Sequence, residues 1–126
     1  MKIGKVAKEA GVSVDTVRFY ERVGVLPEPV RRPSGYREYE AGTIARIKLT
    51  RELQAIGFSL PEVVDALAAH DAGGATCESE RWRLEVVLDR VDERLAELTA
   101  LRGRIVDARH ACESGCCVLR AGPRRG

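Results

Sequence analysis

The stretch VSVDTVRFYERVGVL, residues 12–26, decides the fold of the first half of the chain. Ser13 is a preferred helix N-cap, and Asp15 falls in the first turn, where the helix dipole favours a negative charge. Upstream, apolar residues recur with helical spacing over residues 3–10, and Gly11 is a typical helix stop. Two short helices joined by a glycine turn predict a helix-turn-helix, whose second helix ends at Gly24.

The residues that follow are rich in turn formers and cations. Residues 26–39 contain three prolines and a Ser-Gly pair, which predicts a small hairpin or wing. A third helix is expected over residues 41–56, with Gly57 as its stop. Ser59 and Glu62 form a capping box that opens a fourth helix, and Gly73-Gly74 indicates a linker after it.

The second half reads as one long charged helix with a narrow apolar stripe. The stripe consists of Leu84, Leu88, Val91, Leu95, Leu98, Leu101, Ile105 and Ala108. Spacings of three and four predict a helix that buries this stripe against a partner. We therefore expect a mainly α chain in four parts: a winged helix-turn-helix domain with its helix pair (1–70), a linker (71–76), a dimerisation helix (77–111), and a loop and tail (112–126).

Charge and composition separate the two halves. Residues 1–60 carry 11 Lys and Arg against 7 Asp and Glu, whereas residues 61–126 carry 10 against 12. A basic first half is where a polyanion would dock. No apolar run has the length of a membrane span and the N-terminus does not resemble a signal peptide, so we expect a cytoplasmic protein with no membrane partner.

The four cysteines lie at the two ends of the long helix. Cys77 stands at its start, and Cys112, Cys116 and Cys117 stand at or beyond its end. Some 35 residues of straight helix separate the two groups by roughly 50 Å, so one chain cannot bring them together. Two antiparallel copies could, which predicts a metal site shared between chains. In a reducing compartment, clustered cysteines are more often a metal or redox site than a disulfide framework.

Three motifs in this order closely resemble the MerR family of transcription regulators. Residues 12–26 are similar to the recognition-helix signature of the family, residues 35–39 (GYREY) to its wing, and residues 57–63 (GFSLPEV) to its following helix pair. The resemblance implies a winged helix-turn-helix homodimer held by an antiparallel coiled coil. It also implies binding to double-stranded promoter DNA with an overlong spacer, which the effector-bound dimer distorts so that RNA polymerase can engage it.

The resemblance also assigns candidate contacts with DNA. They are Arg18, Tyr20, Arg37, Tyr36 and Tyr39, and more loosely Ser13, Thr16 and Lys5. Long cations and phenol hydroxyls of this kind reach phosphate oxygens.

Cys77 bears most directly on the effector. In the metal-sensing branch that this chain resembles, sensors of monovalent ions have a serine there and sensors of divalent ions a cysteine, since a divalent ion gains from a third or fourth negative ligand. Aligning Val118-Leu119 with the short helix that usually follows makes Cys117 the second loop ligand beside Cys112, with Cys116 as a spare or fourth ligand. A thiophilic divalent ion is predicted, with mercury ahead of cadmium, lead and zinc.

Other readings of the sequence remain open. The same scaffold with its cysteines could be a thiol-based redox sensor, and a small zinc-stabilised adaptor is a third possibility. His110 and His70 are weaker candidates for ligands. An enzyme is not expected, because no acid, base or nucleophile constellation accompanies a substrate pocket.

Overall fold

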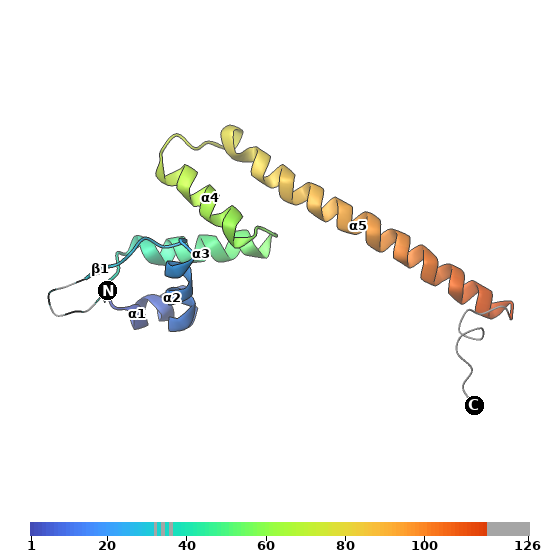
Figure 1. Ribbon diagram of the computed structural model, residues 1–126, viewed down its shortest axis with the longest axis horizontal. Helices are drawn as coiled ribbons and strands as arrows, with labels where there is room; N and C mark the ends of the chain where they lie inside the picture. Colours follow the sequence, from blue (N-terminus) through green and yellow to red (C-terminus); the bar gives the residue numbers. More distant parts are fainter. Residues whose placement is uncertain (32, 34, 36, 116–126) are drawn as a thin grey trace, which may run out of the picture. The chain divides into compact units, whose positions relative to one another are not determined.

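The computed structural model describes residues 1–31, 33, 35 and 37–115 of the 126-residue chain (Figure 1). Its elements, in chain order, are α1 (Ile3–Ala10), α2 (Val14–Arg22), β1 (Val30–Arg31), β2 (Arg37–Glu38), α3 (Gly42–Ala55), α4 (Leu60–Asp71) and α5 (Cys77–Glu113). The mainly α fold predicted from the sequence is confirmed, and each predicted helix begins and ends within two residues of its expected limits.

Local capping explains the turn between α1 and α2. Gly11 follows α1 in the left-handed conformation (φ 74°), which glycine adopts without steric cost. Ser13 then caps α2, because its Oγ accepts a hydrogen bond from the Thr16 N–H at 3.0 Å. These two residues fix the helix-turn-helix geometry.

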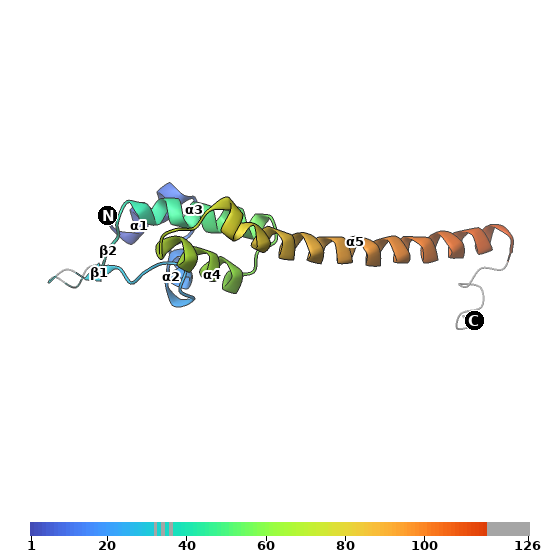
Figure 2. The same cartoon turned by 90° about the horizontal axis from the view of Figure 1, so that it is seen from above.

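The wing is a two-stranded antiparallel hairpin. β1 and β2 pair with Val30 opposite Glu38 and Arg31 opposite Arg37. The chain terminus holds the base of this hairpin: the Met1 ammonium donates to the Tyr39 carbonyl at 2.8 Å, and the Tyr39 N–H donates to the Met1 carbonyl at 2.8 Å. Figure 2 shows the N-terminus beside the two strands.

The predicted capping box opens α4. Ser59 Oγ accepts from the Glu62 N–H at 3.3 Å, and Glu62 Oε1 accepts from the Ser59 N–H at 2.8 Å. Pro61 stands in the first turn, where its missing N–H costs no helical hydrogen bond.

The core of the first half lies among α1, α2, α3 and α4. Among the described residues, the largest fully buried side chains are Val6, Val17, Val25, Ile47, Val63 and Thr50. They come from all four helices and from the turn after α2, so each helix buries one apolar face against the others. The described residues contain no buried side-chain nitrogen or oxygen without a hydrogen-bond partner.

The chain divides into two compact units, the first spanning Met1–Val87 and the second beginning at Leu88. The first unit extends beyond the linker expected at 71–76 because Arg83 bonds to α4 and Val87 joins the core cluster.

α5 is one continuous helix whose apolar stripe is exposed in the single chain. Leu88, Leu95 and Ile105 are 58%, 56% and 60% exposed, respectively. No helix among the described residues is long and apolar enough to cross a membrane.

Candidate nucleic-acid interface and metal ligands

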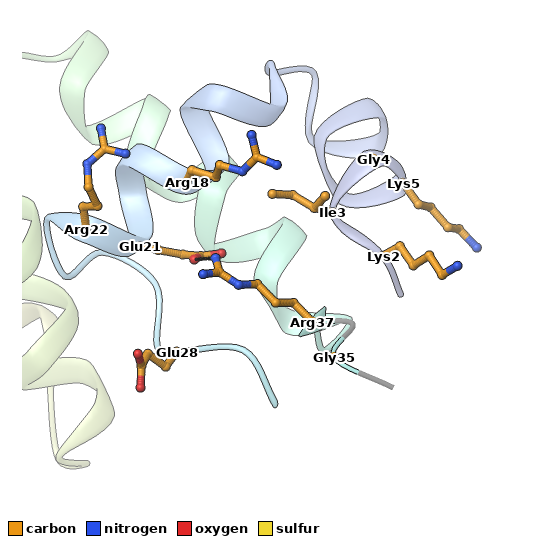
Figure 3. Close-up of a pocket in the computed structure, with 10 residues that line it drawn as sticks. All are labelled: Lys2, Ile3, Gly4, Lys5, Arg18, Glu21, Arg22, Glu28, Gly35 and Arg37. Carbon is orange, nitrogen blue, oxygen red and sulfur yellow. Dashed lines mark hydrogen bonds and ion pairs between the residues drawn. The ribbon is translucent and has the colours of Figure 1, made fainter. Parts of the chain in front are cut away.

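A basic hollow of about 1070 Å³ lies where α1, α2 and the wing meet (Figure 3). It is lined by Lys2, Ile3, Gly4, Lys5, Arg18, Glu21, Arg22, Glu28, Gly35 and Arg37. Five cations face two carboxylates there, and one of these carboxylates is neutralised by Arg37. The surface therefore presents net positive charge to an approaching polyanion.

Two of the predicted DNA contacts, Arg18 and Lys5, are exposed residues of this surface. The Arg18 side chain is 54% exposed, with Asp15 3.7 Å away, and Lys5 is exposed near the start of α1. Ser13 and Thr16 stand at the start of α2, where their hydroxyls lie 2.9 Å apart. Ser13 is exposed and Thr16 is half-buried, so contacts of all four residues with DNA stay predictions.

Glu21 joins the wing to α2. Its Oε2 accepts from Arg37 Nη1 at 2.8 Å and its Oε1 accepts from the Tyr39 hydroxyl, while its own side chain is only 10% exposed. Figure 3 shows the Arg37 guanidinium meeting this carboxylate. The sequence interpretation missed Glu21. The signal was its position four residues after the buried Val17, which puts a carboxylate on the inward side of the helix.

Tyr39 is buried, and burial raises the pKa of its hydroxyl, as does the hydrogen bond to Glu21. Tyr20 is also buried, and its hydroxyl donates to Gln54 Oε1 at 3.0 Å. Both hydroxyls therefore have protein partners in the free chain, so their contact with DNA remains a prediction that requires these bonds to open. Tyr36 lies outside the described residues.

Cys77 is the first residue of α5 and is exposed. The turn that carries it is held by reciprocal bonds: the Thr76 N–H donates to Ser79 Oγ at 2.9 Å, and the Ser79 N–H donates to Thr76 Oγ1 at 3.0 Å. A hollow of about 430 Å³ beside it is lined by Leu53, Phe58, Ala66, His70, Ala75, Thr76, Cys77, Glu80, Arg81, Arg83 and Leu84.

The other predicted ligands lie at the far end of the same helix or beyond it. Cys112 is exposed in the last turn of α5, and Cys116 and Cys117 fall outside the described residues. His110 is exposed, with its Nδ1 3.5 Å from Glu113 Oε2. Across residues 1–31, 33, 35 and 37–115, no three His, Cys, Asp or Glu side chains come together as a metal site. Cys77 and Cys112 thus stand at opposite ends of one helix.

Comparison with known proteins connects the two halves to one family. The family description "MerR HTH family regulatory protein" matches residues 1–70, and "MerR, DNA binding" matches residues 44–108. A mercuric resistance operon regulatory protein of Serratia marcescens is 34% identical over 114 residues, which cover 90% of this chain and 78% of that protein. The HTH-type transcriptional regulator ZntR of Escherichia coli K12 is 31% identical over 112 residues, covering 88% and 79%.

A solved structure agrees with these matches. The transcription regulator PbrR691 from Ralstonia metallidurans CH34, in complex with lead(II), superposes with a TM-score of 0.79 at 32% identity. The match covers 88% of this chain and 87% of PbrR691.

Proposed function

Because the chain belongs to the MerR family of helix-turn-helix regulatory proteins, and is thus a transcription regulator rather than an enzyme, we propose that it responds to a thiophilic divalent metal ion. Mercury(II) is favoured, ahead of cadmium(II), lead(II) and zinc(II). The relatives support a metal effector without agreeing on one, since one is named for mercuric resistance and another was solved with lead(II).

The observation that carries the proposal is the placement of exposed cysteines at both ends of α5. Cys77 is its first residue and Cys112 lies in its last turn. If two copies pair antiparallel along α5, Cys77 of one copy comes beside Cys112 and Cys117 of the other. Three thiolates suit mercury or lead, and Cys116 as a fourth would suit zinc or cadmium.

A homodimer is proposed on the exposed stripe of α5. Leu88, Val91, Leu95 and Leu98 are between 45% and 58% exposed in the single chain. A row of large apolar side chains at coiled-coil spacing is stabilised when a second helix removes it from water.

The basic hollow is proposed as the docking surface for promoter DNA. Arg18, Lys5 and Arg37 supply cations, and Ser13 and Thr16 supply hydroxyls at the N-terminus of α2, where phosphate oxygens bind readily. On this proposal the effector-bound dimer distorts a promoter with an overlong spacer so that RNA polymerase can engage it. The effector must then bind more tightly to the dimer on distorted DNA than to the dimer on undistorted DNA. Equal affinity for these two states would leave the equilibrium between them unchanged.

The test is a titration of the reduced protein with each of the four ions, buffered by a competing small thiol. We expect a thiolate-to-metal charge-transfer band that saturates at two ions per dimer. Loss of a residue that only supports a metal ligand lowers metal affinity roughly 10- to 100-fold. Cys77→Ser removes a proposed ligand itself and should therefore lower the affinity for the ion by more than this. Operator binding by the metal-free variant should be unchanged.

Two results would contradict the proposal. Absence of a charge-transfer band with all four ions would exclude a thiolate effector site. Transcription activated by a mild oxidant alone, in a metal-free promoter assay, would support the redox sensor instead.

Cys116→Ser is the matched control for Cys77→Ser, because it also removes one thiol but should leave mercury binding intact.

A further inference from the structure

Arg83 joins the first turns of α5 to α4. Its Nη1 donates to Asp65 Oδ2 of α4 at 2.5 Å, and its Nε donates to Glu80 Oε1 at 2.9 Å. The guanidinium carbon also lies 4.5 Å from the centroid of the Trp82 ring. With only 12% of its side chain exposed, Arg83 is held in one geometry by three neighbours.

The bonds of Arg83 continue into the turn that carries Cys77. Glu80 accepts from Arg83 through Oε1 and from Ser79 Oγ through Oε2, the latter at 3.2 Å. Ser79 in turn shares the reciprocal capping bonds with Thr76, the residue before Cys77. A short series of hydrogen bonds therefore joins the first turn of α5 to Asp65.

On the other side, α4 is packed into the DNA-binding half. Val63 and Leu67 of α4 are 0% and 3% exposed within the core. A second arginine holds the end of α4: Arg46 Nη1 and Nη2 each donate to the Asp71 carboxylate at 2.9 Å, and Arg46 Nε donates to the Val25 carbonyl at 2.6 Å. Two Asp–Arg pairs thus bond α4 to neighbouring helices. Of the two, only Asp65–Arg83 is connected by further hydrogen bonds to the turn that carries Cys77.

We propose that Arg83 is a positioning residue that couples the state of the Cys77 turn to the DNA-binding half through Asp65. This inference rests on the proposed function, since it concerns how effector binding at Cys77 alters the promoter. An arginine suits the role because its planar fork holds two carboxylates on different helices in a fixed orientation, which the single ammonium of lysine does not.

The experiment compares Asp65→Asn with Asp71→Asn in the full-length protein. Each variant neutralises one α4 carboxylate that bonds to an arginine, but only Asp65 bonds to Arg83. The readout is energy transfer between dyes at the two ends of a promoter fragment, with and without thiol-buffered mercury(II). From it we obtain the equilibrium constant between undistorted and distorted promoter DNA. The factor of interest is the ratio of this constant with mercury(II) to the constant without it.

We expect Asp65→Asn to reduce this factor roughly 2- to 30-fold, the range for substitutions along coupling networks. Asp71→Asn should keep the wild-type factor, although both variants lose an ion pair. Arg83→Lys should behave like Asp65→Asn and provides the test if Asp65→Asn fails to fold. A wild-type factor in both Asp65→Asn and Arg83→Lys would overturn the proposal, as would an equal loss in Asp71→Asn.

A second readout needs no metal. Trp82 is the single tryptophan of the chain and stacks on Arg83, so its fluorescence reports on this contact. Operator binding by metal-free protein should change Trp82 emission in the wild type but not in Asp65→Asn. If mercury does not bind at all, the proposed function fails, while this fluorescence comparison still decides the role of Arg83. A change in Trp82 emission in Asp65→Asn as large as that in the wild type would contradict this role.

Discussion

Gly57 lies directly against Val87, so closely that a Cβ atom at Gly57 would meet Val87 Cγ1 at 3.0 Å. Val87 is the one buried residue of α5. Gly57 also has a φ of 109°, a backbone conformation that residues with side chains rarely adopt. The close approach of the turn before α4 to the third turn of α5 therefore depends on the absence of a side chain at Gly57.

Gly57→Ala should destabilise the first unit by about 1–3 kcal/mol, because the new methyl group overpacks against Val87 and the backbone is strained. Thermal unfolding followed by circular dichroism measures the effect. Gly73→Ala is the control, since Gly73 has a positive φ of 83° but no atom within 4 Å of an added Cβ. Equal losses in the two variants would mean that the contact with Val87 contributes nothing.

Tyr39 should titrate above its ordinary value of 10.0, because burial and the hydrogen bond to Glu21 both raise its pKa. A raised pKa in the folded state means that the stabilisation by this hydroxyl is fully present below pH 10 and is lost as the pH rises through the folded pKa. Tyrosinate absorbance and unfolding between neutral and alkaline pH measure both effects. Glu21→Gln should move the pKa of Tyr39 back toward 10.0, whereas a Tyr39 that ionises normally in the wild type would contradict this arrangement.

Lys5→Ala should weaken operator binding and lower the slope of log affinity against log salt by about 1, as expected for the loss of one phosphate contact. Fluorescence anisotropy over a series of salt concentrations measures the slope. Lys48→Ala is the matched control, because Lys48 is an exposed lysine on α3 that does not line the basic hollow. The same decrease in both variants would show only the effect of net charge.

Leu98→Glu should convert the proposed dimer to monomer at concentrations where the wild type is paired. A carboxylate in the stripe must lose its hydration on pairing, and each 1.4 kcal/mol of this cost weakens association about tenfold. Sedimentation equilibrium measures the change. Ala100→Glu adds the same charge at an exposed position about half a helical turn from Leu98, so dissociation of this variant to the same extent would count against the stripe as the interface.

Local signals in the sequence were sufficient for the helices and their caps. Gly11, Ser13 and the Ser59–Glu62 box each act within a few residues, and the structure confirms all of them. The family was also recognisable from residues 12–26, 35–39 and 57–63, and the basic character of the first half from the charges of residues 1–60. The DNA and metal contacts of individual residues remain predictions, and those of Cys116, Cys117 and Tyr36 concern residues that the structure does not describe.

The sequence by itself determined the order of the helices, the wing, the apolar stripe of α5 and the placement of cysteines at its two ends, because helical periodicity and capping are short-range properties of the chain. Only the tertiary structure decided which carboxylates meet which arginines and tyrosines. Glu21 with Arg37 and Tyr39, and Asp65 with Arg83, are 16 to 18 residues apart in sequence. Such pairs form because packing of the core brings separate elements together. Short-range sequence patterns do not show which residues of different elements will meet.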